Sequence, residues 1–255
     1  MTPLLEAKGI SKRFGGVQAL KEVSLTIAAG EIYGLIGPNG AGKTSFFNVL
    51  TGLYSADAGA FRFAGKPLDT GSPHRVASAG ISRTFQNIRL FANMTALENV
   101  MVGRHIRSRA GVIGAVLRDG ATRREEAAIA RRAHELLAYV GIAERGNDLA
   151  SQLAYGDQRR LEIARALAGE PKLLALDEPA AGMNATETAA LRRLIVGLRH
   201  DGLTVLLIEH DVKLVLGLCD RVAVLDYGEL IAEDEPEAVR RDPRVVEAYL
   251  GANYA

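Results

Sequence analysis

The fold of this chain is decided by the stretch Gly37-Pro38-Asn39-Gly40-Ala41-Gly42-Lys43-Thr44. A short apolar run at residues 32–36 precedes it and predicts a buried strand. An amphipathic run at residues 44–53 follows it and predicts a helix. In this context the glycines, the lysine and the threonine match GxxxxGK[ST], the pattern of a phosphate-binding loop. Residue frequencies in this chain allow roughly 0.006 accidental matches to that pattern.

The residues of this loop suit the binding of a nucleoside triphosphate. Successive backbone N–H groups form a concavity around phosphate oxygens, and only residues without bulk let the backbone approach so closely. We expect the backbone to approach the phosphates at the three glycines of the motif. The lysine would place a positive charge near the β and γ phosphates, and the threonine would offer a hydroxyl to Mg²⁺. The nucleotide-binding residues predicted in this segment are Gly37, Asn39, Gly40, Ala41, Gly42, Lys43, Thr44 and Ser45.

Two acidic residues follow a second apolar run. Residues 173–176 predict a buried strand, and Asp177 and Glu178 come directly after it. Ligands bind at the carboxyl ends of the strands in open α/β sheets. Such a pair is common in turns, but with a phosphate-binding loop upstream we expect two separate roles. Asp177 would hold Mg²⁺ through water, and Glu178 would polarise the attacking water.

The pattern along the chain alternates between strands and helices. Further strands are expected at residues 81–85 and 204–208, and helices at residues 123–140 and 185–200. Short connections between such elements favour a parallel sheet covered by helices. The first thirty residues instead carry short apolar segments joined by a tight turn, which is typical of hairpin strands.

Composition narrows the class of protein. The chain has 255 residues, 31 basic against 30 acidic side chains and one cysteine, Cys219. This balance gives no support to a nucleic-acid partner, and a single cysteine that cannot form an internal disulfide suits a reducing cytoplasm. No apolar run approaches the roughly 18 residues of a membrane span. The arginine-rich stretch at residues 104–145 is interpreted as a solvated face, with a partner site as the alternative.

Taken together, the motifs resemble those of ATP-binding cassette (ABC) ATPases. The features that carry the resemblance are GPNGAGKT, Gln86, LAYGD at residues 153–157, LALDEP at residues 174–179 and His210. Within that family the segment after LAYGD, the residues 180–184 and the arginine-bearing insert are similar to the LivG-type subunit of branched-chain amino acid importers. Urea-import and lipopolysaccharide-export ATPases carry similar motifs and remain alternatives.

The resemblance implies a fold of class α/β. Its core would be a P-loop NTPase (RecA-like) fold, with an N-terminal antiparallel β subdomain and an inserted α-helical subdomain. The whole chain would form a single ABC ATPase domain, with the core at about residues 1–92 and 166–235. The helical insert would occupy about residues 93–165, and a C-terminal tail would occupy residues 236–255.

The resemblance also implies further site residues. Phe14 would stack on adenine, although a core aromatic beside a turn is the alternative. Gln86 would reach the Mg²⁺ and the attacking water, and His210 would contact the γ phosphate. Tyr155 and Gly156 would lie at a helix N-terminus and face the ATP held by a second subunit.

Four positions depart from the usual pattern of the family, and at one of them Tyr155 replaces a glycine. Ala154 lacks a hydroxyl, and Asp157 stands where glutamine is usual and would repel phosphate. Asn184 stands where an aspartate often closes the dimer contact. The roles of Asp157 and Asn184 therefore stay open.

The implied function is Mg²⁺-dependent hydrolysis of ATP that drives import of branched-chain or related amino acids. The expected partners are a second ATPase subunit, identical or homologous, integral membrane permease subunits and, indirectly, a solute-binding protein, with no nucleic acid. The expected location is the cytoplasmic face of a bacterial plasma membrane. A non-transport cassette protein acting on nucleic acid or ribosomes is an alternative. A P-loop kinase or GTPase is another, but it leaves LAYGD and His210 without a purpose.

Overall fold

The computed structural model describes residues 3–107 and 120–251 of the chain. They form two compact units. The first unit comprises Met1–Arg83, Lys172–Ala181 and Arg192–Ala255, and the second comprises Thr84–Pro171 and Gly182–Leu191. Part of the predicted insert, residues 108–119, and the end of the predicted tail, residues 252–255, lie outside the described residues.

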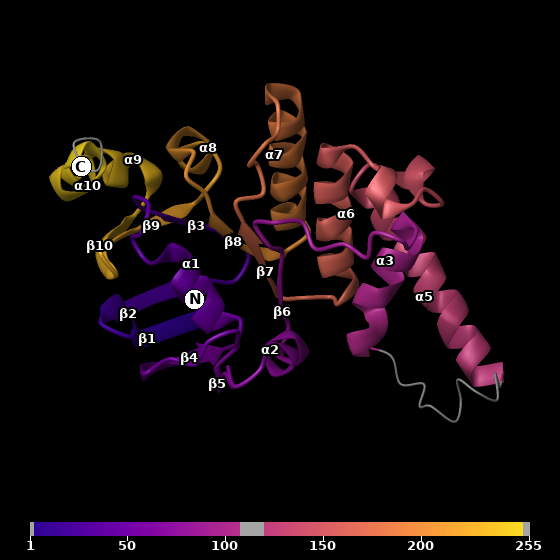
Figure 1. The fold of residues 1–255 in the computed structure, drawn as a ribbon, viewed down its shortest axis with the longest axis horizontal. Coiled ribbons are helices and arrows are strands. Elements are labelled where there is room, and N and C mark those ends of the chain that lie inside the picture. Colours follow the sequence, from indigo (N-terminus) through magenta and orange to yellow (C-terminus); the bar gives the residue numbers. More distant parts are fainter. Residues whose placement is uncertain (1–2, 108–119, 252–255) are drawn as a thin grey trace. The chain divides into compact units, whose positions relative to one another are not determined.

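The first unit contains two sheets (Figure 1). The smaller sheet is antiparallel and has the order β2-β1-β4-β5. Its strands alternate between buried and exposed residues, as expected where one face covers a core and the other meets water. The strands are β1 (Pro3–Phe14), β2 (Val17–Ala28), β4 (Ala58–Phe63) and β5 (Lys66–Pro67).

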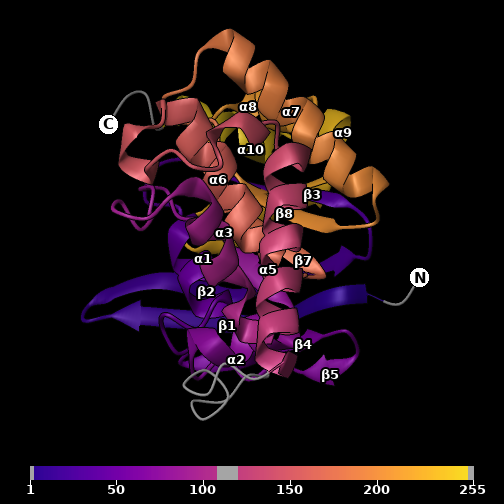
Figure 2. The same ribbon diagram turned by 90° about the vertical axis from the view of Figure 1, so that its right-hand side faces the viewer.

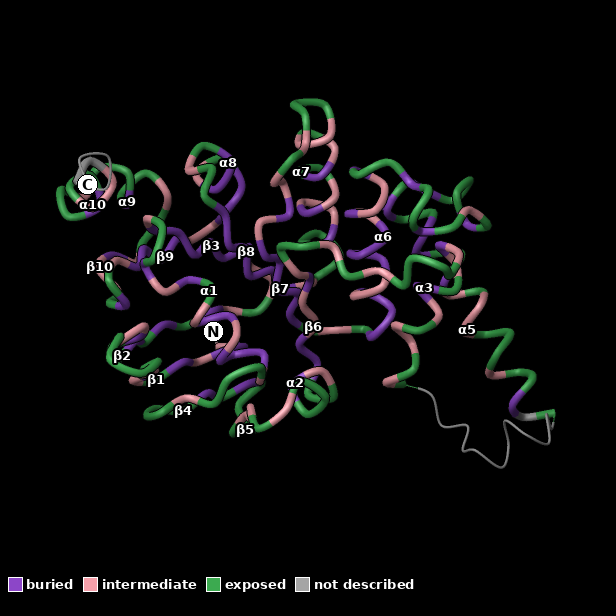
Figure 3. Tube along the Cα trace, in the orientation of Figure 1, coloured by how far each residue is buried: buried purple, intermediate pink, exposed green. Residues whose placement is uncertain are grey.

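The larger sheet has the order β10-β9-β3-β8-β7-β6 and is parallel except for the antiparallel pair β9 and β10. Every residue of β3, β7 and β8 is buried, as Figure 3 shows along these strands. Continuous apolar runs are typical of parallel strands covered on both faces. The strands are β3 (Ile32–Ile36), β6 (Ile81–Arg83), β7 (Leu173–Asp177), β8 (Thr204–Ile208), β9 (Arg221–Asp226) and β10 (Glu229–Asp234).

One apolar cluster joins the two sheets through helix α1 (Lys43–Leu50). Phe46, Phe47 and Leu50 are fully buried in it, as the helical spacing predicts. The cluster includes Leu5 from the small sheet and Leu173 from the large one. This packing fixes the helix that begins at Lys43 against the strands that surround it.

The other helices of the first unit are short. A serine cap starts α2 (Pro73–Ala79), where Ser72 accepts a hydrogen bond from the N–H of Arg75. Asp211 caps α8 (Val212–Leu216) in the same way, and Val215 of this helix lies against Gly34 of β3. The last described helices are α9 (Pro236–Arg241) and α10 (Pro243–Gly251), so the predicted tail is helical where it is described.

The second unit is built from helices. The helix α3 (Ala96–Gly103) packs against α5 (Gly120–Tyr139) and α6 (Tyr155–Ala168), and α5 also contacts α6 (Figure 2). Thr95 and Glu98 form a capping box that fixes the start of α3. Short 3₁₀ turns lie at Arg104–Arg107, Ala143–Arg145 and Ala150–Gln152. The first residues of α7 (Ala185–His200) belong to this unit and the remainder belongs to the first unit.

The expected α/β fold class is confirmed, with its parallel sheet, antiparallel sheet and helical unit. One expected strand was too long. The strand expected at residues 81–85 ends at Arg83, because the backbone of Phe85 bonds to side chains of α6. Within the part of the chain that the structure describes, no helix combines the length and apolar character needed to cross a bilayer.

Candidate active site

The glycine-rich loop connects β3 to α1 and is tightly enclosed. Gly37 has a φ of 151°, and a Cβ there would lie 2.1 Å from the carbonyl oxygen of Leu225. Gly42 has a φ of 102°, and a Cβ there would lie 2.5 Å from the carbonyl oxygen of Ala19. Both positions therefore require glycine on grounds of conformation and of space. The loop therefore packs closely against the backbone of β9 at Leu225 and of β2 at Ala19.

The Lys43 side chain lies inside the curve of this loop. It is 8% exposed, and Nζ donates hydrogen bonds to the carbonyl oxygens of Gly37 at 2.7 Å and Pro38 at 2.9 Å. Burial lowers the pKa of Lys43, and the nearby carboxylates of Glu178 and Asp177 oppose that shift. A cation held in the cradle with two carboxylates near it suits a triphosphate together with a divalent metal ion.

The start of α1 adds further polar groups to the cradle. Gly42 is the N-cap residue of this helix and has a left-handed backbone conformation, so no side chain covers the first N–H groups from the N-cap position. Thr44 is exposed and Ser45 is half-buried, so hydroxyls stand in the first turn beside the N–H groups of the helix end. Asn39 and Gly40 are exposed, whereas Ala41 is buried. The loop therefore presents one open side to solvent.

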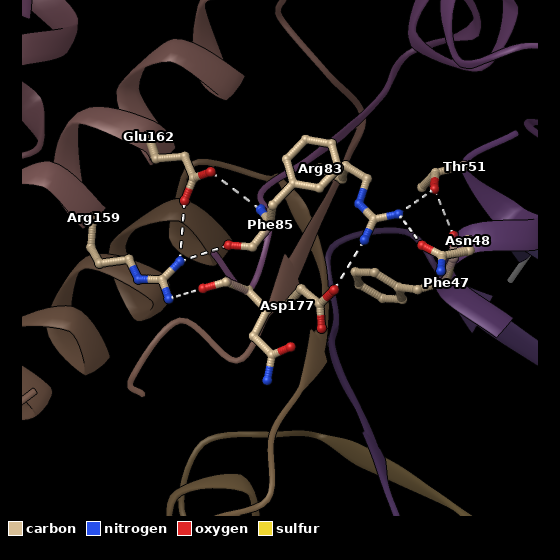
Figure 4. Close-up of polar contacts among 9 residues, drawn as sticks. Phe47, Asn48, Thr51, Arg83, Phe85, Arg159, Glu162 and Asp177 are labelled. Carbon is tan, nitrogen blue, oxygen red and sulfur yellow. Dashed lines mark hydrogen bonds and ion pairs between the residues drawn. The ribbon is translucent and has the colours of Figure 1, made fainter. Parts of the chain in front are cut away.

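Asp177 ends β7 and is almost fully buried. Its Oδ2 lies 3.0 Å from Nη2 of Arg83, the last residue of the neighbouring strand β6 (Figure 4). A hydroxyl from Thr44 and a carboxylate from Asp177 are oxygen ligands of the kind that Mg²⁺ takes beside substrate phosphates. These residues fit the predicted metal ion.

Glu178 follows β7 directly and lies in a turn. Its φ of 46° is in the left-handed region, which side-chain-bearing residues adopt at some energetic cost. Its N–H donates to the carbonyl oxygen of Ile208 at 2.9 Å, so the turn is fixed to the end of β8. His210 follows that strand, and its Nδ1 lies 3.6 Å from Oε2 of Glu178. Glu178 and His210, predicted separately, are brought together.

Glu209 is a residue of this cluster that the motifs did not single out. It is fully buried, and its Oε1 accepts a hydrogen bond of 2.8 Å from the N–H of Ala180. Its Oε2 lies 3.9 Å from Nδ1 of His210. Burial raises the pKa of Glu209 above its ordinary range. In the sequence, Glu209 could be noticed only as a single acidic residue between an apolar strand and a histidine.

Phe14 lies at the end of β1 and is 41% exposed. Its ring meets that of Tyr54 edge to face, with centroids 5.1 Å apart, and Nζ of Lys12 lies 5.5 Å from the Phe14 centroid. The alternative of a core aromatic is wrong, because a core side chain would be buried. An exposed aromatic ring remains available for stacking on a base.

The remaining predicted residues belong to the second unit. Tyr155 and Gly156 open α6, as the expected helix N-terminus requires. Tyr155 is 42% exposed, and its Oη accepts a hydrogen bond of 3.0 Å from Arg159. A Cβ at Gly156 would lie 2.7 Å from Oε1 of Glu187, so glycine is required there. Gln86 is exposed.

A buried ion pair on α6 holds the segment around Gln86. Arg159 and Glu162 are both nearly inaccessible, with Nη1 and Oε2 3.3 Å apart. Arg159 donates to the carbonyl oxygens of Phe85 and Gln86, and Glu162 accepts from the N–H of Phe85 (Figure 4). The helix that starts with Tyr155 therefore fixes the backbone at Gln86.

Asp157 and Asn184, two of the departures from the family pattern, have local roles. Asp157 lies in the first turn of α6, and its Oδ1 is 3.8 Å from Arg160, which offsets its negative charge. Asn184 forms reciprocal hydrogen bonds with Glu187, of 3.0 Å and 2.9 Å, at the start of α7. Asn184 is thus a helix cap, a role that the motif pattern of the sequence did not predict.

A parallel sheet in which the loop after β3 cradles a buried lysine, and in which an aspartate and a glutamate lie at the end of β7, separated from β3 by β8, defines a nucleotide-hydrolysing P-loop protein. Residues 20–181 match the model of the family described as "ABC transporter", and residues 229–255 match "Branched-chain amino acid ATP-binding cassette transporter". The chain belongs to the ABC transporter family and is one of its ATPases.

Relatives and solved structures agree with that assignment. The chain is 46% identical to the high-affinity branched-chain amino acid transport ATP-binding protein LivG of Salmonella typhimurium, over 98% of both chains. It superposes on the ADP conformation of an ATP-binding cassette of an ABC transporter with a TM-score of 0.85 and 32% identity, covering 98% of this chain and 100% of that one. A dimeric cassette in a post-hydrolysis state, bound to ADP and Pi, gives a TM-score of 0.77 and 26% identity, covering 91% and 98%.

Proposed function

We propose that this chain is the ATP-hydrolysing subunit of an importer of branched-chain or related amino acids. The observation that supports this substrate class is the similarity to LivG along the whole chain, including the C-terminal segment shared with branched-chain cassette proteins. The alternatives of urea import and lipopolysaccharide export share the nucleotide site. The substrate itself would meet the membrane and solute-binding subunits.

Hydrolysis would use the cluster at the ends of β7 and β8. Glu178 would orient the attacking water and accept its proton, and His210 would stabilise the negative charge on the γ phosphate. Lys43 would neutralise the β and γ phosphates, and the N–H groups of residues 37–44 would bind their oxygens. Phe14 would stack on the adenine and fix the other end of the nucleotide.

Mg²⁺ would be held by Thr44 and Asp177, with Gln86 as the third predicted contact. The ion would withdraw charge from the β and γ phosphates when bound. Asp177 fits this role because it is held in one orientation by Arg83, and Thr44 fits it because its hydroxyl is exposed at the start of α1.

A second ATPase subunit would complete each site. Tyr155 and Gly156 stand at the N-terminus of α6, where unpaired N–H groups attract anions. They would face the γ phosphate bound by the partner subunit, and two ATP molecules would then close the dimer. The dimeric cassette among the similar structures supports this arrangement. The partner is either a second copy of this chain or a homologous subunit.

Membrane permease subunits would dock on the second unit near Gln86. Phe91 and Met94, a few residues further on, are 47% and 37% exposed, which supports an apolar contact surface there. Through these subunits the chain would lie on the cytoplasmic face of a bacterial plasma membrane and would act indirectly with a solute-binding protein. A single cassette domain with its insert at about residues 93–165 would carry both the surface that faces the second ATPase subunit and the surface that binds the permease subunits.

Purification from membranes tests this proposal. The tagged chain is isolated in mild detergent and the co-purifying subunits are identified. Permeases that, with a binding protein, transport leucine, isoleucine or valine support the proposal. Permeases that transport urea, lipopolysaccharide-export subunits, or ribosomes contradict the substrate class.

A further inference from the structure

Arg83 occupies a central position that no motif assigns. It is the last residue of β6 and pairs in register with Ala175 of β7, two residues before Asp177. Its side chain is only 9% exposed, and that of Asp177 only 5%. A buried arginine therefore lies beside the carboxylate proposed to hold Mg²⁺.

The guanidinium of Arg83 connects that carboxylate to helix α1. Nη2 lies 3.0 Å from Oδ2 of Asp177, while Nη1 donates to Oδ1 of Asn48 at 2.9 Å and to Oγ1 of Thr51 at 2.7 Å (Figure 4). The guanidinium carbon also lies 5.3 Å from the centroid of the Phe47 ring. One planar group thus spans the distance between the end of β7 and α1.

Each hydrogen bond of Arg83 pairs a donor with an atom that is able to accept. The hydroxyl of Thr51 donates to the carbonyl oxygen of Phe47 at 2.6 Å, so its oxygen is left to accept from Arg83. Arginine presents its donors in a rigid fork, and its hydrogen bonds to a carboxylate are charge-assisted. Lysine carries the same charge but could not reach all three acceptors with the same geometry.

Helix α1 also carries Thr44 in its first turn. Asn48 lies one turn after Thr44, and Thr51 caps the end of the helix. Because a helix of this length is stiff, fixing its far end to Asp177 sets the position of Thr44 relative to that carboxylate. The two side chains proposed to hold Mg²⁺, Thr44 by its hydroxyl and Asp177 through water, would then keep one relative geometry.

We propose that Arg83 is a positioning residue that orders Asp177 and α1 for the binding of Mg²⁺ with ATP. This inference rests on the proposed function of Thr44 and Asp177. It differs from a merely structural role, in which Arg83 would only fasten the edge strand β6 to the sheet. Partners outside the ligand set that orient metal ligands commonly change metal affinity by about 10- to 100-fold when they are replaced.

The test measures nucleotide binding rather than turnover. A fluorescent ATP analogue is titrated into the full chain at a series of Mg²⁺ concentrations and, separately, in EDTA. For Arg83→Lys we expect the Mg²⁺ concentration that gives half-maximal enhancement of binding to rise about tenfold. Affinity in EDTA should stay within about twofold, because the loop and Lys43 are unchanged.

Two further variants provide a second test of the Arg83 contacts and a control. Thr51→Val keeps the shape of the side chain, removes one acceptor of Arg83 and should shift the Mg²⁺ midpoint in the same direction by a smaller factor. Arg75→Lys alters an exposed ion pair with Asp69 in the same unit and should leave the midpoint unchanged. If Arg83→Lys does not fold, the shift in Thr51→Val alone decides the inference.

The outcomes separate this inference from the proposed function. An unchanged Mg²⁺ midpoint in folded Arg83→Lys and Thr51→Val, or an equal loss of affinity with and without Mg²⁺, overturns the positioning role. Absence of any Mg²⁺-dependent binding in the unaltered chain would instead overturn the proposed metal site itself.

Discussion

His210 Nδ1 lies 3.6 Å from Oε2 of Glu178, although the two residues come from the ends of different strands. The contact is set by the backbone, because the N–H of Glu178 donates to the carbonyl oxygen of Ile208. The fold itself therefore makes neighbours of the proposed general base and the proposed γ-phosphate contact.

Replacing Glu178 by glutamine should stop hydrolysis and preserve binding. The amide keeps the size of the side chain but cannot accept the proton of the attacking water, so kcat should fall by about 10²- to 10⁴-fold. ATP affinity should be unchanged, and a dimer with trapped ATP should accumulate in size-exclusion chromatography. Turnover at the rate of the unaltered chain would remove Glu178 from the role of base.

Replacing His210 by alanine should also lower kcat, by about 10²-fold, because a group that stabilises developing charge on the phosphate is lost. His200→Ala is the matched control, since His200 is an exposed histidine at the end of α7. Steady-state ATPase assays at saturating MgATP compare the two. Equal activity in both variants would show that His210 has no part in the reaction.

Gly42→Ala should weaken nucleotide binding and destabilise the fold. The new Cβ would lie 2.5 Å from the carbonyl oxygen of Ala19, so the loop must move away from β2. Gly202→Ala is the control, because its φ of 86° carries similar strain while nothing lies within 4 Å of the added Cβ. We expect strain alone to lower the free energy of unfolding of the control, by about 1–2 kcal/mol in urea unfolding. A loss in Gly42→Ala no greater than this would contradict the tight enclosure of the loop.

Glu209→Gln should stabilise the chain increasingly as pH rises. Burial raises the pKa of Glu209 from its ordinary 4.5, so the folded state binds the proton more tightly than the unfolded state. The stability that this proton contributes is complete below pH 4.5 and is lost as pH rises through the folded-state pKa. Glutamine does not titrate and retains an oxygen for the N–H of Ala180.

Urea unfolding of the two chains between about pH 4 and pH 8 measures this difference. Because His210 and Glu178 also influence Glu209, the comparison is repeated in a His210→Gln background. A difference in unfolding free energy that stays constant or shrinks with rising pH would contradict the raised pKa.

The sequence predicted the nucleotide loop and the carboxylates because each signal is local. A short apolar strand, a glycine loop and a helix must be contiguous, and Asp177 and Glu178 adjoin another apolar strand. The end of β6, in contrast, is determined by residues that are distant in sequence. Thr84 and Phe85 are residue types that favour strands, but the Phe85 backbone bonds to Arg159 and Glu162, which are distant in sequence.

Buried polar groups were the features that the sequence could not predict. Arg159 and Glu162 stand three residues apart on a helix, a spacing usual for exposed ion pairs, yet both are inaccessible. Glu209 and Arg83 are single charged residues at strand ends, and only the packing of neighbouring elements buries them. Their partners are side chains and backbone groups that the chain brings close through its tertiary fold.

Reconstituted transport tests whether this ATPase drives uptake of branched-chain amino acids. The chain is assembled in liposomes with its co-purified permease and binding protein, and uptake of labelled leucine is measured with MgATP. We expect ATP-dependent leucine uptake that is absent with the Glu178→Gln subunit. Uptake that proceeds equally with Glu178→Gln, or active ATP hydrolysis without leucine uptake, would show that this chain does not drive leucine import.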